Sequence, residues 1–177
     1  MQAHTIDEVI ELLDEIVEET KRANNPAGYF AALYRKVTIR VKEGISNNEF
    51  EDGSRMEKLD VIFANRYLVA YHTFYKQEIP TASWQVALRK ANKFWPIVLQ
   101  HLLWGMNAHI NLDLGIAAAE TASGASINDL KQDFDQINEL LADDKNFKSS
   151  SRYHINTACR EHIRLSRGLR QLSGFSP

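Results

Sequence analysis

The chain has 177 residues, enough for one domain with a sizeable core, and its 44% hydrophobic and 25% charged residues are typical of a globular protein. A formal net charge of −2 gives no electrostatic basis for binding nucleic acid or an anionic membrane. The one cysteine, Cys159, excludes an internal disulfide and fits a reducing compartment.

The first fifty residues are expected to form two helices. Thr5 and Glu8 make a capping box ahead of apolar residues spaced by three and four, which predicts an amphipathic helix ending near residues 24–25. Pro26 suits the first turn of a second helix over residues 26–45. Its segment VTIRV alternates as a strand would, but it has no clear partner strand, so we interpret it as helical.

Two more helices are predicted after the turn-rich segment SNNEFEDGS. Ser54 and Glu57 form a second capping box, which opens a helix over residues 56–77. That helix is apolar and aromatic nearly all round, so we expect it to be largely buried. Thr81 or Ser83 begins a shorter helix after the break EIPT.

The longest apolar run follows Pro96. A proline disfavours helical geometry at the residue before it, so a kink or a new helix start is expected at residue 95. Within the run, NAHINLDL alternates polar and apolar residues, but a strand must pair and nothing else offers a convincing strand. We therefore predict a buried central helix over about 97–122, stopping before Gly124, and an amphipathic helix capped by Ser126 after it.

Together these patterns predict an all-α fold, a single-domain helical bundle of about six or seven helices that spans residues 1–144. Residues 145–177 are basic and Ser-rich, and we expect one exposed helix and a loose end there. The acidic, amphipathic N-terminus is not typical of a signal peptide, and no uncharged apolar run reaches the roughly 18 residues of a membrane span. A cytoplasmic protein is predicted.

The central helix contains the strongest chemical signal. At about 100° per residue, His109 and Asp113 lie about 40° apart on one face, and Glu120 returns to about 20° from His109. A His-x-x-x-Asp pair offers one nitrogen and one carboxylate on adjacent turns, which suits a divalent metal such as Zn or Fe. Asp60 and His101 are candidates for further ligands, although Asp60 could equally form a structural ion pair with an Arg or Lys of another helix.

An alternative interpretation needs no metal. A buried carboxylate needs a partner, and Asp113 can obtain one by hydrogen bonding to the His109 ring. Asn107 and Asn111, which face the opposite way, would then tie neighbouring helices together. The predicted structural polar network consists of Asn65, Asn107, Asn111 and Glu120 beside the His-Asp pair.

Three segments resemble a known family: MEKLDVIFANRYL, LQHLLWGMNAHINLDLGIAAAE and DFDQINELLA are similar to the signatures of a bacterial domain of unknown function. The likeness runs from about Phe30 to about Asp143, and GMNAHINLDLG carries it. It implies an all-helical domain without an established activity. The polar positions that it marks are Asp60, Asn65, Arg66, His101, Asn107, His109 and Asp113.

A fainter likeness is to zinc-dependent phospholipase C and single-strand nucleases, which bind zinc through His-x-x-x-Asp on a core helix. His109 and Asp113 match that pair, and Asp60 with His72 loosely matches a second one. No histidine follows Asp113 until His154, so the resemblance implies one metal site of that type at most.

Two functions follow from these observations. The first is a metal-dependent, hydrolase-like enzyme, with His109 and Asp113 as metal ligands, Asp60 and His101 as further ligands or a general base, and Arg66 as an anion-binding group. The second is a non-catalytic helical scaffold that binds a small-molecule ligand or a partner, with the polar network in a structural role. A homo-oligomer is compatible with either function.

Overall fold

The computed structural model describes residues 2–91, 93, 98–122 and 127–143. Every element in these ranges is helical, which confirms the predicted all-α bundle. Four predictions concern residues outside the described ranges. They are the kink or new helix start before the proline at residue 96, the stop before Gly124, the cap at Ser126, and the exposed helix and loose end over residues 145–177. Among the helices that are described, none is long and apolar enough to cross a membrane.

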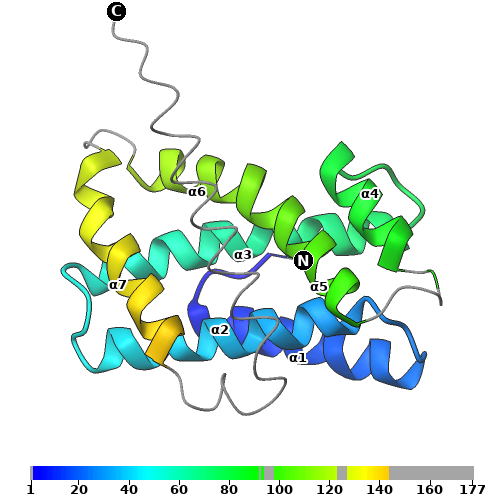
Figure 1. Cartoon of the computed structure of the whole chain (residues 1–177), viewed down its shortest axis with the longest axis horizontal. Helices are drawn as coiled ribbons and strands as arrows, with labels where there is room; N and C mark the ends of the chain where they lie inside the picture. The colour runs from blue at the N-terminus through cyan, green and yellow to red at the C-terminus, as the bar shows by residue number, and fades with distance from the viewer. Residues whose placement is uncertain (1, 92, 94–97, 123–126, 144–177) are drawn as a thin grey trace, which may run out of the picture.

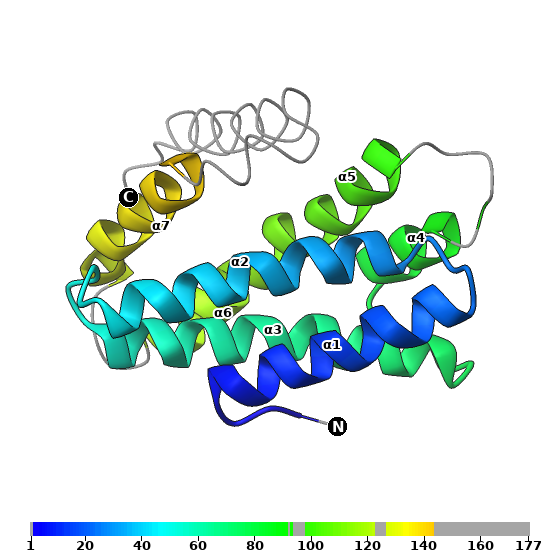
Figure 2. The same ribbon diagram turned by 90° about the horizontal axis from the view of Figure 1, so that it is seen from below.

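Three long helices form the body of the molecule: α1 (Ile6–Arg22), α2 (Gly28–Ser46) and α3 (Gly53–Tyr75). They pack side by side (Figure 2). The segment VTIRV lies inside α2, as predicted. Buried side chains from all three helices, with others from the helices that follow, make the larger of two core clusters.

The caps of α1 and α3 show where the local prediction succeeded and where it failed. Thr5 accepts a hydrogen bond from the backbone N–H of Glu8 at 3.2 Å and caps α1 as predicted. For α3 the predicted cap was wrong, because Asp52 accepts from the N–H of Arg55 and the helix begins at Gly53. Glu57 instead accepts from the backbone N–H of Ile6 and joins the start of α1 to α3.

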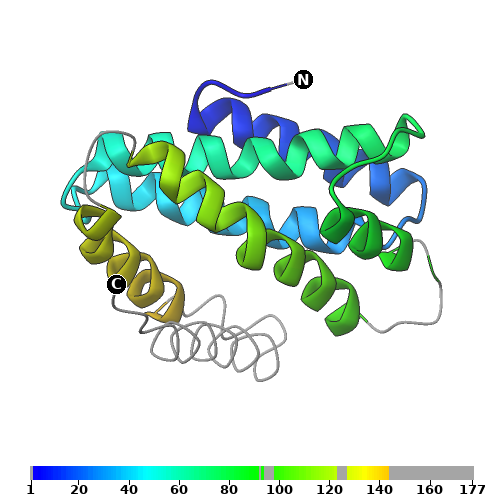
Figure 3. The ribbon, with the colours of Figure 1, turned by 90° about the horizontal axis from the view of Figure 1, so that it is seen from above.

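The second half of the chain wraps around this body. The short helix α4 (Ala82–Ala91) precedes α5 (Val98–Ala108), and α6 (Leu114–Thr121) continues α5 through the π-helical segment η1 (His109–Asp113). Figure 3 shows this continuous helix crossing obliquely over α2 and α3, with α1 on their far side. A 3-10 turn, η2 (Ile127–Leu130), then leads into α7 (Lys131–Asp143), which packs on α2 (Figure 1).

The continuous helix occupies the place of the predicted buried central helix, but it buries only one face. Val98, Leu103 and Leu112 are exposed on its outer side. On its inner side Gly105 lets the helix approach α2 closely, because a Cβ at this position would overlap the Phe30 ring. Phe30 thereby reaches the ring of His109 on η1, with ring centroids 5.7 Å apart.

Candidate functional site

The predicted His-x-x-x-Asp pair lies in η1, where the helix widens for one π-type turn. The N–H of Leu114 donates to the carbonyl of His109, five residues back. A π-turn inserts one extra residue into an α-helix, and such insertions are frequent at functional sites. Both His109 and Asp113 are buried, at 3% and 0% exposure, and they point into the molecule.

Three side chains donate hydrogen bonds to the buried carboxylate of Asp113. Arg66 on α3 donates through Nε to Oδ1 at 2.8 Å, and Trp84 on α4 donates through Nε1 to Oδ2 at 2.6 Å. The Nδ1 atom of His109 lies 3.3 Å from the same Oδ2 atom. Asp113 therefore joins α3, α4 and η1 through one group.

These contacts decide the charge states of the pair. Burial alone would raise the pKa of Asp113, but hydrogen bonds from His109, Arg66 and Trp84 outweigh burial and hold the pKa below its ordinary value. Burial lowers the pKa of His109, and the attraction of Asp113 only partly offsets it. At neutral pH the site thus contains an ionised carboxylate and a neutral imidazole, whose Nδ1–H donates to Asp113.

Aromatic rings enclose His109. The imidazole stacks on Phe63 with a centroid separation of 3.6 Å and an interplanar angle of 4°. Tyr34 meets it edge-on at 4.6 Å, and Trp84 lies at 5.7 Å. This apolar enclosure explains why the neutral ring is favoured.

The other proposed metal ligands do not join the pair. In the part of the chain that the structure describes, no three His, Cys, Asp or Glu side chains gather closely enough to hold a metal ion. His101 is buried beside Tyr29 and Trp104, at ring distances of 6.0 and 5.8 Å. Asp60 is buried on α3, where burial, and secondarily Glu57, raises its pKa to about 7.

The hydrogen bonds that Asp113 accepts do not suit a metal ion either. Both carboxylate oxygens already accept from N–H groups, and the cation beside them is the permanently charged guanidinium of Arg66. A zinc ion would need deprotonated ligand atoms whose lone pairs are free to coordinate it. Arg66 supplies the positive charge that a metal would otherwise bring, so the residues as arranged do not fit the implied metal.

The predicted asparagine network takes a different form. Asn65 binds the backbone of Ala3, accepting from its N–H at 2.7 Å and donating to its carbonyl at 2.8 Å, and so fixes the N-terminal segment on α3. Asn107 and Asn111 are exposed, and Asn111 Nδ2 donates to Asn107 Oδ1 at 2.6 Å. These two residues bind each other along one helix, and this contact does not tie neighbouring helices together.

Glu120 is exposed rather than part of a buried network. The angle expected between Glu120 and His109 assumed an unbroken α-helix. The extra residue of the π-turn rotates all later residues by about 100° relative to that expectation. Glu120 consequently lies at the wall of a surface pocket.

That pocket, which we call the Arg66 pocket, lies beside α3 and α6 and has a volume of about 570 Å³. Its polar wall consists of Gln2, Asn65, Arg66, Thr73, Thr81, Asp113 and Glu120. Its apolar wall consists of Ile62, Val69, Ala70, Ile79, Pro80 and Trp84. Its volume lies within the range of pockets that bind small molecules.

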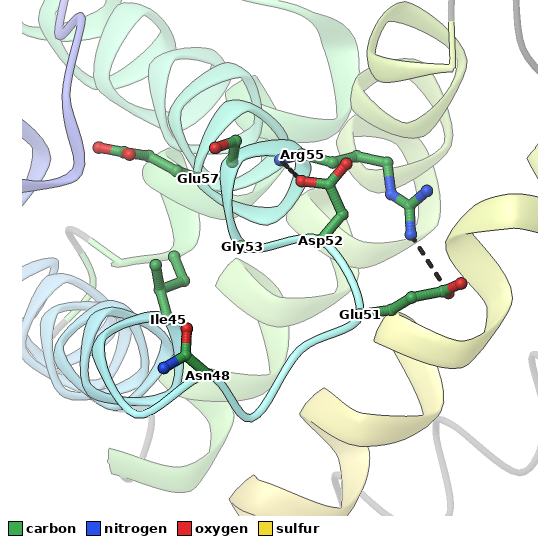
Figure 4. A pocket seen from close by; sticks show the side chains of 8 residues that line it. Ile45, Asn48, Glu51, Asp52, Gly53, Arg55 and Glu57 are labelled. Atoms are coloured by element: carbon green, nitrogen blue, oxygen red, sulfur yellow. Dashed lines mark hydrogen bonds and ion pairs between the residues drawn. The ribbon is translucent and has the colours of Figure 1, made fainter.

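A second pocket of about 560 Å³ lies at the turn between α2 and α3 and is predominantly acidic (Figure 4). Its charged side chains have structural partners. Asp52 caps α3, Arg55 binds Glu51 and the buried Asp133 of α7, and Glu57 binds Ile6. Because these charged side chains are engaged in structural contacts, this pocket leaves fewer charged groups for a ligand than the Arg66 pocket does.

Sequence reasoning missed the part that Trp84 plays. Trp84 is buried, and its indole N–H also binds Asp113. A buried indole N–H needs a hydrogen-bond acceptor. A tryptophan in the core therefore signals that a polar group, here the carboxylate of Asp113, lies beside it. Arg66, which was proposed from the sequence as an anion-binding group, pairs with Asp113.

Fold and site together define an all-helical protein with a His-Asp-Arg-Trp network, centred on the buried Asp113, beside an open pocket. The chain belongs to a family of unknown function, DUF5995, whose model matches residues 6–147. The match includes α1, which the resemblance in sequence had left out. No curated protein and no solved structure matches the chain.

Proposed function

We propose that this protein binds a small organic molecule with an acidic group, a carboxylate or a phosphate, in the Arg66 pocket. One observation carries the proposal: Arg66 is held on one side by Asp113 while its side chain remains 27% exposed at the pocket wall. Its Nε–H is used by Asp113, and the described residues offer its two Nη groups no hydrogen bond.

Asp113 prepares Arg66 for this role. A guanidinium presents its donors in a planar fork that matches two oxygens of a carboxylate or phosphate. Free arginine side chains lose rotamer entropy when they bind, but the Nε–Asp113 bond already fixes this one. The charge of Asp113 weakens the long-range attraction of Arg66 for an anion, so directional hydrogen bonds supply the larger share of binding.

The rest of the pocket limits the ligand further. Ile79 is 82% exposed and Val69 is 40% exposed at the apolar wall, which gives an organic group surface to cover. Glu120 also lines the pocket, and its negative charge disfavours a second acidic group. A ligand with one acidic group and an apolar body fits this wall best.

The test is a ligand-observed NMR screen of small carboxylates and phosphate monoesters against the full chain. We expect at least one compound to bind and Arg66→Lys to weaken it about tenfold, because lysine keeps the positive charge but loses the fork. Arg55→Lys is the matched control, since Arg55 also pairs with a buried aspartate but lies in the acidic pocket. Binding that survives Arg66→Lys unchanged would refute the proposal.

The metal-dependent hydrolase remains the competing proposal, with Zn or Fe at His109 and Asp113. It requires Arg66 and Trp84 to leave Asp113 and make room for the ion. Elemental analysis of protein purified without a metal-affinity tag tests it. Stoichiometric metal that disappears in His109→Ala would favour the hydrolase, whereas trace metal that is unchanged by this substitution would count against it.

A further inference from the structure

We propose that Tyr34, Thr38, Asp60 and His109 line a buried hydration site, in which ordered water joins α2, α3 and η1. The four side chains, which we call the interior polar cluster, are at most 6% exposed. Each has a polar atom without a hydrogen-bond partner among the described protein atoms: Tyr34 Oη, Thr38 Oγ1, Asp60 Oδ2 and His109 Nε2.

The register of α2 against α3 places three of these residues together. Phe30 on α2 meets Tyr67 on α3 at 5.0 Å between ring centroids, and one turn further Tyr34 meets Phe63 at 5.9 Å. The two helices therefore run antiparallel, and each turn forward on α2 corresponds to one turn back on α3. By the same register the next turn sets Thr38 level with residue 59, so Asp60 lies one residue further along the same turn of α3.

His109 adjoins the same place from η1. Its ring contacts both Phe63 and Tyr34, and its Nδ1 atom is directed to Asp113. In that tautomer Nε2 is a hydrogen-bond acceptor on the other edge of the ring. Burial raises the pKa of the Tyr34 hydroxyl, and the charges of Asp60 and Asp113 raise it further, so both carboxyl groups act electrostatically on this hydroxyl.

Water satisfies such a set of atoms better than any other ligand. Buried polar atoms without partners cost about 1–3 kcal/mol each, and native proteins nearly always pair them. A buried water makes two to four hydrogen bonds and can both donate and accept. The cluster supplies an acceptor at His109, hydroxyls at Tyr34 and Thr38 that do both, and a carboxyl group at Asp60.

The direct test is a crystal structure of the full chain at about 1.5 Å resolution. We expect at least one water within about 2.7–3.2 Å of two or more of the four atoms. A dry cluster, direct protein hydrogen bonds between the four side chains, or a metal ion in the place of the water would each overturn the proposal.

Two nearly isosteric variants test it in solution. Thr38→Val keeps the volume of the side chain but removes the hydroxyl, and Tyr34→Phe does the same for the phenol. If water bonds these hydroxyls, each variant lowers Tm by about 2–4 °C, because the water loses a partner that it had. If the cluster is dry, each variant removes an unpaired polar atom and Tm stays or rises, which refutes the proposal.

The double variant separates hydration from packing. Two hydroxyls that share a water are coupled, so the loss of Tm in Thr38→Val combined with Tyr34→Phe should differ from the sum of the single losses. Thr38→Ser is the control, because it keeps the hydroxyl and removes only a methyl group. Strict additivity of the two losses would refute a shared water.

Discussion

Two buried aspartates of this protein pair with arginine in different ways. Asp133 on α7 accepts from Arg55 Nη2 at 2.6 Å and from the backbone N–H of Glu51 at 2.8 Å. Asp113 in η1 pairs with Arg66. Both carboxylates are fully buried, and the two arginine side chains are similarly exposed, at 22% and 27%.

The difference lies in the remaining partners. Asp133 uses a backbone amide, and its bonds hold α7 against the turn between α2 and α3. Asp113 uses only side chains, from three elements, and one of them is the imidazole of His109. A buried ion pair therefore says little about function by itself, and the groups around it distinguish a structural contact from a candidate site.

The largest effect is expected from removing the charge of Asp113. Asp113→Asn should lower the free energy of unfolding by about 3–5 kcal/mol, because it breaks a buried pair and turns an amide N–H toward existing donors. Urea denaturation followed by circular dichroism measures the loss. Asp133→Asn is the matched variant, and we expect about 2–3 kcal/mol there because fewer side-chain donors lose their acceptor. An equal or larger loss in Asp133→Asn would contradict the comparison.

A comparable effect, with pH dependence, is expected at Asp60. Its folded-state pKa of about 7 lies above the ordinary value of 3.8, so the folded protein favours the protonated carboxyl group. Stability is unaffected while the group is protonated in both states, below about pH 4, and falls as the pH rises through 7. The difference of about three pKa units corresponds to about 4 kcal/mol at most.

Asp60→Asn removes this dependence. Relative to the wild type, the variant should gain stability between pH 4 and 7 and keep the gain at pH 8. The lowered pKa of His109 acts the other way, since it reduces stability as the pH falls below about 6.5, but it is present in both proteins and cancels in the difference. Urea denaturation at pH 4, 6 and 8 measures this difference, and a difference that does not vary with pH would contradict the raised pKa.

A smaller loss is expected at Trp84, the donor that sets Asp113 apart from Asp133. Trp84→Phe keeps an aromatic ring but removes the N–H that binds Asp113, and it should cost about 1–3 kcal/mol in urea denaturation. Trp104→Phe is the control, because Trp104 packs partly buried against the same core. Similar losses in the two variants would mean that Trp84 acts through packing alone.

The sequence predicted local structure well because local structure depends on neighbouring residues. The periodic apolar residues and the Thr5 cap predicted α1, and the spacing of His109 and Asp113 placed them on one face of a helix. The cap of α3 was harder to predict, because Asp52 and Ser54 are both suitable capping residues within the same turn.

The candidate site depends on contacts that spacing does not encode. Trp84 and Arg66 reach Asp113 from 29 and 47 residues away, so only the packing of α3, α4 and η1 determines that they meet. The π-turn left no mark on the apolar pattern, yet it moved Glu120 to the surface. Angles computed from an ideal helix are therefore reliable only within the turns on either side of such an insertion.

The smallest effect is expected at Asn111, on the face of η1 opposite to Asp113. Asn111 and Asn107 are exposed, and the hydrogen bond between them competes with water, so Asn111→Ala should change the free energy of unfolding by less than about 0.5 kcal/mol. Alanine also favours helix, which offsets part of any loss. A loss above about 1 kcal/mol in urea denaturation would mean that this face is covered in solution. Polar residues on both faces of η1 would then make contacts. Asp113 alone would no longer account for the difference between η1 and the structural pair at Asp133.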